Sequence, residues 1–251
     1  MKAGMVIIAM SCCLQAAELA STNTEPKMFS FSAKSAVLSQ YVFAETGQVF
    51  HDDPVLQSEI GVETKWGIYA TIWHSTDFDS DPSGDYGDEL DYYLGWAGNV
   101  GPVSLDVGFS YFDAIELFRG AKDDTFYLYA RVGKTFESKT GSYTPFLKGN
   151  LYINGRGSEV EGGTVVTAGL EYEPPLPIEW LSLPARFQIG YDDGAFGNDN
   201  GFISGFALEA NWQVSERFSI TAPILQVSIP LTTHDERETE WVIGGGIVFN
   251  F

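Results

Sequence analysis

The last stretch of the chain, Glu240-Trp-Val-Ile-Gly-Gly-Gly-Ile-Val-Phe-Asn-Phe251, decides the fold class. Its residues alternate between two faces. The apolar face carries Trp241, Ile243, Ile247, Phe249 and Phe251. Strict alternation is the period of a β-strand, whereas soluble domains usually end in a frayed polar tail. A strand that ends on Phe is typical of the closing strand of a bacterial outer-membrane barrel. The alternative is a secreted sandwich protein with an accidental aromatic end.

The last six residues also resemble the signal by which such barrels are recognised for membrane insertion. That signal has a glycine followed by aromatic residues at the third and last positions, and Gly246, Phe249 and Phe251 match it. A polar residue usually stands two places before the glycine, where this chain has Gly244. The resemblance implies that the barrel-assembly machinery is a partner of the chain.

The N-terminus predicts export. Lys2 precedes a short apolar stretch, residues 3–9, and small residues follow it, which indicates a cleaved signal peptide over residues 1–20. We expect a short periplasmic segment at 21–28 and the barrel at 29–251. Both cysteines, Cys12 and Cys13, lie in the signal peptide, so the mature chain has no cysteine chemistry. A lipid anchor on Cys12 is the alternative.

Composition narrows the class further. The net charge is −20, with 34 acidic against 14 basic residues, which excludes a general nucleic-acid binder. No run of eighteen apolar residues predicts a transmembrane helix after the signal peptide. A mean hydropathy of −0.05 with 27 glycines suits strands that are apolar on one face and polar on the other.

From residue 29 onward the sequence repeats one unit: about ten alternating residues and then a break. The pattern predicts an antiparallel up-and-down barrel of about twelve strands. The predicted strands cover residues 29–43, 54–64, 67–76, 89–98, 103–112, 125–134, 142–153, 164–173, 183–191, 202–212, 218–229 and 240–251. Alternation is ambiguous in the first, third and eleventh strands. In the eleventh, Pro223 indicates a bulge that swaps the faces.

The breaks alternate in length, which indicates membrane topology. Short breaks, such as 65–66 and 99–102, alternate with long acidic or glycine-rich ones, such as 44–53 and 77–88. Outer-membrane barrels have short periplasmic turns and longer outer loops. We therefore expect both termini on the periplasmic side and an apolar face toward lipid. Residues 174–180 are long for a periplasmic turn.

Residues 36–112 resemble the TorF-type putative porins, a family of small outer-membrane barrels. The matching segments are Leu38-Ser-Gln-Tyr-Val-Phe43, Asp53-Pro-Val-Leu-Gln57, Gly67-Ile-Tyr-Ala-Thr-Ile-Trp73, Glu89-Leu-Asp-Tyr-Tyr-Leu-Gly95 and Leu105-Asp-Val-Gly-Phe-Ser-Tyr111. The resemblance implies a passive channel. The family usually has Asp before the first Tyr and Arg-Gly after the Phe, where this chain has Gln40, Ala44 and Glu45.

Charged residues on the polar strand faces are the candidate pore lining. They are Lys34, Glu59, Asp91, Asp106, Arg131, Lys148, Glu171, Arg186 and Glu209. A lumen of about twelve strands would be narrow and partly filled by Tyr93, Tyr127, Tyr129 and Arg131. Charges at a constriction set ion selectivity. The alternative is that these groups pair with one another and plug the barrel.

Two further motifs are weaker. Asp77, Asp79 and Asp81 have the spacing of a calcium loop, but Pro82 stands where the loop needs glycine. We expect residues 77–89 to be an exposed acidic loop that meets divalent ions of lipopolysaccharide. The histidines, His51, His74 and His234, fall at predicted outer ends or loops. An Asp–His hydrolase site at the rim is an alternative, although His74 and Ser75 point to opposite strand faces.

The sequence thus predicts an all-β barrel in the bacterial outer membrane that acts as a porin-like channel. Small cationic or neutral solutes would diffuse through it, with outer-membrane lipid and lipopolysaccharide as its surroundings. We expect no enzymatic activity, no cofactor and no nucleic-acid partner. The alternatives are a plugged structural or adhesive barrel with acidic outer loops, and a rim hydrolase.

Overall fold

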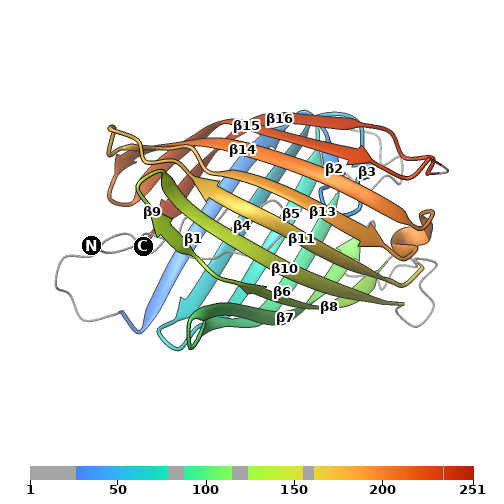
Figure 1. Cartoon of the computed structure of the whole chain (residues 1–251), viewed down its shortest axis with the longest axis horizontal. Coiled ribbons are helices and arrows are strands. Elements are labelled where there is room, and N and C mark those ends of the chain that lie inside the picture. The colour runs from blue at the N-terminus through green and yellow to red at the C-terminus, as the bar shows by residue number, and fades with distance from the viewer. Residues whose placement is uncertain (1–26, 79–87, 115–123, 155–160, 234) are drawn as a thin grey trace.

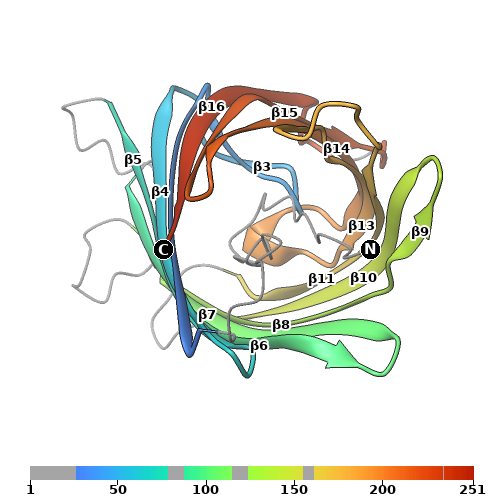
Figure 2. The ribbon, with the colours of Figure 1, turned by 90° about the vertical axis from the view of Figure 1, so that its left-hand side faces the viewer.

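The computed structural model describes residues 27–78, 88–114, 124–154, 161–233 and 235–251. Within them the chain forms a closed antiparallel barrel of twelve wall strands (Figures 1 and 2). The wall strands, in barrel order, are β1 (Phe29–Leu38), β4 (Val55–Thr64), β5 (Ile68–Asp77), β6 (Glu89–Val100), β7 (Val103–Ala114), β8 (Thr125–Gly133), β10 (Gly141–Asn154), β11 (Gly163–Glu173), β13 (Ala185–Asp192), β14 (Gly201–Ser215), β15 (Phe218–Pro230) and β16 (Glu240–Asn250). The predicted fold and strand number are confirmed.

Five short elements lie beside these strands. β9 (Phe136–Ser138) extends the β8–β10 hairpin, and β12 (Leu181–Ser182) pairs with β14 in the long connection after β11. The 3₁₀ turn η1 (Ala195–Gly197) follows β13. β2 (Tyr41–Phe43) and β3 (Gln48–His51) pair only with each other, as a separate two-stranded sheet.

The terminal strand closes the barrel as the sequence predicts. β16 pairs with β1 from Ser32 opposite Asn250 to Leu38 opposite Gly244, so no sheet edge stays open. Its glycines permit this contact: a Cβ on Gly246 would lie 2.4 Å from the carbonyl oxygen of Ser35. The start of β1 and the end of β16 lie at the same end of the barrel, here called the terminal end (Figure 1). The other end is the loop end.

The predicted bulge in β15 is also present. The register between β15 and β16 shifts between Thr221 and Ile224. Thr221 and Ile224 are both buried, although an uninterrupted strand would place residues three apart on opposite faces. The bulge at Pro223 therefore swaps the faces and explains the ambiguous alternation.

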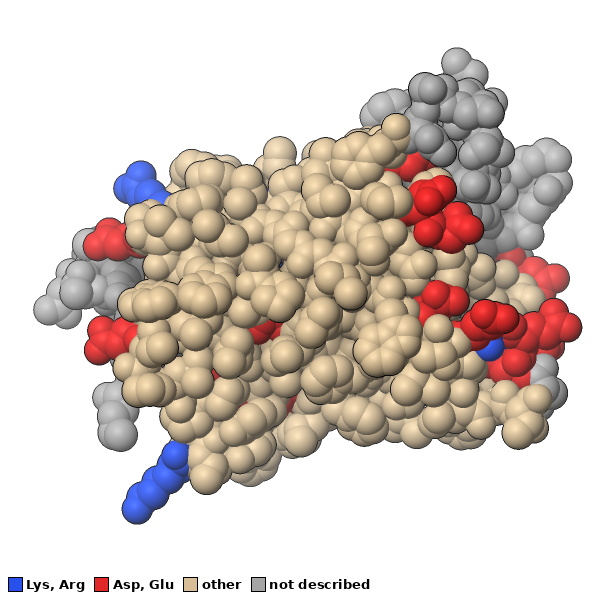
Figure 3. Space-filling view, turned by 90° about the horizontal axis from the view of Figure 1, so that it is seen from above, with Lys and Arg blue, Asp and Glu red and all other residues tan. Residues whose placement is uncertain are grey.

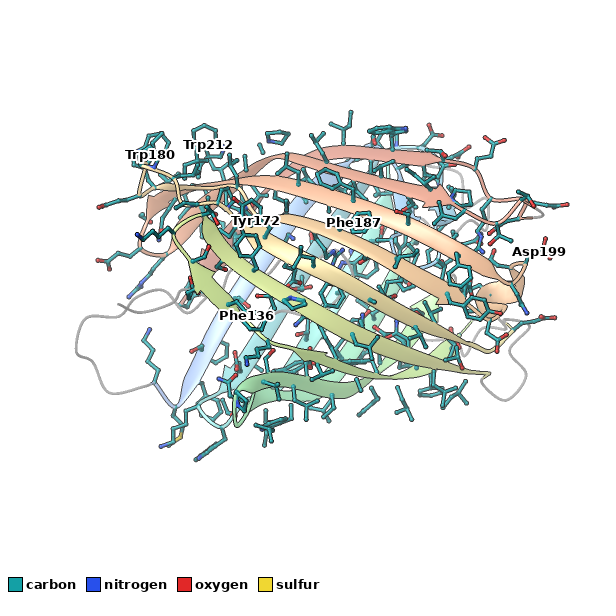
Figure 4. The ribbon with its side chains drawn as sticks, in the orientation of Figure 1. Phe136, Tyr172, Trp180, Phe187, Asp199 and Trp212 are labelled. Atoms are coloured by element: carbon teal, nitrogen blue, oxygen red, sulfur yellow. The ribbon has the colours of Figure 1, made fainter. Side chains whose placement is uncertain are left out.

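The outer surface of the barrel is apolar. Large hydrophobic side chains are exposed on every side of the wall, including Ile60 on β4, Leu94 on β6, Phe187 on β13 and Ile243 on β16. Acidic side chains gather at the loop end, the terminal end carries both basic and acidic ones, and the band between the two ends carries almost no charge (Figure 3). Trp180 and Trp212 stack with ring centroids 5.5 Å apart at the terminal end (Figure 4). Such a band with aromatic residues at its border is suited to lipid.

The inner face is polar and aromatic. Tyr69 donates a 2.7 Å hydrogen bond to Asp106, and Tyr93 donates one of 2.7 Å to Asp91. Glycine makes room for these rings, since a Cβ on Gly95 would lie 2.5 Å from the Tyr69 ring. Tyr93, Tyr127 and Tyr129, which we expected to fill part of the lumen, are each at least 96 % buried, with exposed fractions of 3 %, 2 % and 4 %.

Candidate functional site in the barrel lumen

Residues 39–54, here called the inward hairpin, start at the loop end (Figure 1) and fold into the lumen (Figure 2). The expectation that β1 runs to Phe43 and that residues 44–53 form an outer loop is therefore wrong. β1 ends at Leu38, where the Ser39 backbone N–H donates to the Ile243 carbonyl (2.8 Å). The hairpin turns at Gly47, which has φ of +70°. Alternation alone could not show this, because an apolar strand face is buried equally well by a lumen.

An aromatic cluster packs the hairpin against the wall. Phe43 contacts Phe112 of β7 and Tyr152 of β10, with centroids 6.3 and 6.4 Å apart. Phe196 of η1 lies 5.8 Å from Phe43 and 4.8 Å from Tyr152. Tyr41 reaches Trp73 of β5 at 5.5 Å. These rings fix the hairpin across the barrel interior.

Polar contacts hold the tip of the hairpin to the opposite wall. The Glu45 carboxylate accepts hydrogen bonds from Lys148 and Asn150, both on β10. The Ala44 carbonyl accepts one from Gln188 of β13 at 3.1 Å. The Glu45 side chain is 5 % exposed, so its ion pair with Lys148 is shielded from solvent.

Arg237, in the loop between β15 and β16, clasps the hairpin at the loop end. Its guanidinium donates to the Thr46 carbonyl at 2.7 Å and pairs with Asp192 and Asp235, both at 2.6 Å. Burial lowers the pKa of Arg237, but the hydrogen bonds to the two carboxylates raise it overall, so the group stays charged. Sequence reasoning missed this residue, because nothing near it predicts a buried partner.

All nine predicted lumen charges lie on the inner side of the barrel. Glu59, Asp91, Asp106 and Glu209 are buried, with exposed fractions of 6 %, 1 %, 3 % and 5 %, and the other five are half-buried. Two groups form. Lys34 lies directly opposite Glu59 across the β1–β4 pair. The second group occupies the wall that faces the hairpin tip.

That second group is an arc of acidic and basic side chains on neighbouring strands. Arg131 pairs with Glu171 at 2.7 Å and stands directly opposite both Asp106 on β7 and Lys148 on β10. Glu171 in turn lies opposite Arg186 on β13. Glu45 of the hairpin therefore joins a wall on which every basic side chain has an acidic neighbour. Whether these residues line a conducting pore stays a prediction.

A cavity of about 80 Å³ lies between the inward hairpin and the wall on the other side of the lumen. Hairpin residues 40–44 form one side. Strands β1, β4, β5, β6, β14, β15 and β16 form the rest, and contribute Lys34, Glu59, Trp73, Asp91 and Glu209. Three carboxylates and one ammonium group thus surround a space bordered by aromatic rings.

The remaining expectations fall partly outside this lumen. The calcium-like residues Asp79 and Asp81, and His234, lie outside the described residues, as does the chain up to residue 26, which includes the predicted signal peptide. No described group of three or more His, Cys, Asp or Glu side chains is placed to hold a metal ion. Among the described residues no helix has the length and apolarity to cross a membrane.

The residues considered for catalysis do not come together. Ser75 is fully buried, whereas the side chain of His74 points to the other face of β5. His51 lies in the inward hairpin and is 6 % exposed. In the predicted insertion motif, Phe249 and Phe251 are exposed on the barrel exterior (38 % and 56 %), which leaves them accessible to lipid or protein.

A closed barrel with an apolar exterior and a polar, charged interior defines the class of the protein. Such a barrel satisfies its backbone groups internally and is stable in lipid. In a bacterial chain this is the architecture of the outer membrane. We therefore place the protein there.

Comparison with known families is consistent with this class. The chain belongs to the family described as "Bacterial protein of unknown function (Gcw_chp)", whose model matches residues 21–203. The search of curated proteins finds no match.

Solved structures share the fold at low identity. The KdgM porin in complex with disordered oligogalacturonate aligns with a TM-score of 0.54 and 8 % identity, over 88 % of this chain and 99 % of that one. The NanC porin aligns with a TM-score of 0.54 and 6 % identity, over 87 % and 98 %. An outer membrane channel from Pseudomonas putida F1 aligns with a TM-score of 0.51 and 11 % identity, over 93 % and 100 %. The chain is thus similar in fold to outer-membrane channels.

Proposed function

We propose that the protein is a passive channel of the outer membrane for small cationic or neutral solutes, with the inward hairpin as its constriction. The observation that carries the proposal is the placement of the hairpin. It crosses a polar lumen, binds one wall through Glu45 and leaves a charge-lined cavity beside the other wall. The resemblance to the TorF-type putative porins and the channel-like fold relatives support it.

The mechanism is diffusion down a gradient through a narrowed, charged passage. The inward hairpin reduces the cross-section, and the wall charges select among the solutes that fit. The nine wall residues comprise four basic and five acidic groups, and Glu45 adds a sixth acid. A net negative lining favours cations over anions.

Planar-bilayer recording tests this proposal. The purified barrel should show stable single-channel conductance, and a KCl gradient should give a reversal potential of the sign expected for cation preference. A correctly folded barrel, shown by heat-modifiable mobility on gels, that never conducts would refute the channel. A reversal potential of the anionic sign would refute the selectivity alone.

The aromatic cluster favours a second function, that of a plugged structural or adhesive barrel. Phe43, Phe112 and Tyr152 fill the space beside the hairpin with apolar rings. A variant in which a short Gly-Ser linker replaces residues 41–51 separates the two functions. If the barrel is plugged, only this variant conducts; if it is a channel, the intact protein conducts as well.

We further propose that the protein is not an enzyme and that its contacts at the two ends are with the membrane machinery. Gly246, Phe249 and Phe251 would be read by the barrel-assembly machinery, and the acidic loop at 77–89 would meet divalent ions of lipopolysaccharide. Replacing Phe251 with Ser should lower the amount of barrel in the outer membrane. Lipid or peptide hydrolysis that disappears in His74→Ala would overturn the non-enzymatic assignment.

A further inference from the structure

We propose that the cavity beside the inward hairpin is a binding site for small organic ammonium compounds. The inference deepens the proposed channel function, since it assigns a solute class to one place on the permeation path. The cavity of about 80 Å³ is several times the roughly 10–15 Å³ that one water molecule needs. It can therefore hold a compound of about five non-hydrogen atoms.

Two buried carboxylate oxygens without hydrogen bonds distinguish the cavity from an exposed acidic surface. Glu59 and Glu209 line the cavity and are 6 % and 5 % exposed. The Oε1 atom of each is buried and has no hydrogen-bond partner among the described residues. Lys34 stands opposite Glu59, but no described donor reaches either Oε1 atom, and a buried polar atom without a hydrogen bond is unfavourable. An ammonium group in the cavity that both residues line would supply the missing donor.

The aromatic rings add the second element of ammonium recognition. Trp73 stands directly opposite Glu59 on β4 and directly opposite Asp91 on β6. Tyr41 of the hairpin lies 5.5 Å from the Trp73 ring, at an interplanar angle of 53°. Ring faces flanked by carboxylates attract organic cations through both cation–π and charge interactions.

The lining also sets the sign and kind of the ligand. Of the described residues that border the cavity, three are carboxylates and Lys34 alone is basic. An anion would meet net repulsion. A metal ion needs several oxygen ligands on one centre, and the described residues offer no group of three His, Cys, Asp or Glu side chains so placed. An alkylammonium ion fits both the charge and the rings.

Calorimetric titration of the folded barrel in detergent micelles tests the site. The probes are propylammonium, its neutral counterpart propan-1-ol, and Ca²⁺. Propylammonium should bind, and Glu59→Gln or Glu209→Gln should weaken binding by about tenfold or more, since each removes a charge-assisted contact. Lys34→Met should tighten binding severalfold. Glu238→Gln, a change at an exposed loop acid, should have no effect.

Each result of the titration leads to a different conclusion about the site. Equal affinity in the wild type, Glu59→Gln and Glu209→Gln would overturn the site, and so would binding of propan-1-ol as tight as that of the amine. Binding of Ca²⁺ alone, lost in the same variants, would replace it with a metal site. If a Gln variant fails the heat-modifiability test, Lys34→Met decides by the sign of its effect. Binding by a barrel that never conducts would refute the channel and leave the site standing.

Discussion

The contact between Glu45 and the β10 wall makes a quantitative prediction about the inward hairpin. Glu45→Gln keeps the size of the side chain but removes the charge that accepts from Lys148 and Asn150. Hydrogen bonds to charged groups contribute about 1.5–3 kcal/mol each. Because glutamine still offers one carbonyl acceptor, we expect the hairpin to lose about 2 kcal/mol of docking free energy.

A loss of about 2 kcal/mol raises the equilibrium constant for hairpin release about 30-fold. The remaining contacts, chiefly the Phe43 packing and the Arg237 bond to Thr46, should keep the hairpin docked most of the time. Single-channel recording should therefore show brief openings of higher conductance whose total duration rises about 30-fold. The reversal potential should also shift toward anions, because one lumen carboxylate is gone.

A double-mutant cycle separates this contact from a general loosening of the barrel. Lys148→Met should produce openings like those of Glu45→Gln, and the double variant should open little more than either single variant. Additive effects of the two changes would show that the residues do not act on each other. Openings and reversal potential that match the wild type in Glu45→Gln would refute the docking role altogether. Glu238→Gln serves as the control for loss of one exposed acid.

Three further predictions address the clasp, the seam and the exterior. Arg237→Gln leaves Asp192 without its 2.6 Å partner, so hydrogen exchange in residues 43–47 should become faster; unchanged protection there would exclude the clasp. Gly246→Val places a Cβ 2.4 Å from a β1 carbonyl oxygen and should abolish heat-modifiable mobility. A Cβ on Gly149 meets nothing within 4 Å, so Gly149→Ala should fold. Equal folding of both variants would contradict the close pairing of β1 with β16. Leu94 is 45 % exposed on the outer face, so Leu94→Arg puts a charge there. If that face meets the bilayer midplane, the change should lower the free energy of unfolding in urea by about 2–4 kcal/mol. An unchanged free energy of unfolding would count against a lipid-facing exterior.

The sequence by itself determined the barrel. Apolar residues alternate with polar ones over segments near ten residues long, and this period places one face of each strand in lipid. The ends of most strands followed from the same pattern, as at Glu89 and Val103, because turns interrupt it. The closing pair of β16 and β1 followed from the terminal aromatic strand and the need to leave no open edge.

The lumen charges were also readable from alternation, since a charged residue between two lipid-facing ones must point inward. Alternation could not show which of these charges lie next to one another. Arg131 and Glu171 are forty positions apart, on β8 and β11, and their 2.7 Å contact reaches across β10 and depends on the shear that aligns these strands. Only closure of the barrel fixes that register.

The inward hairpin was decided by the tertiary structure alone. Tyr41, Val42 and Phe43 continue the apolar pattern of β1, so local preference gives no reason for the chain to leave the wall at Ser39. Long-range contacts draw these residues out of the wall and into the lumen. The contacts are with rings on β7 and β10, with the residues on β10 that bind Glu45, and with Arg237, and all of these partners lie at least 60 positions further along the chain. A one-dimensional pattern records which residues avoid water, but the lumen and the lipid both satisfy that requirement.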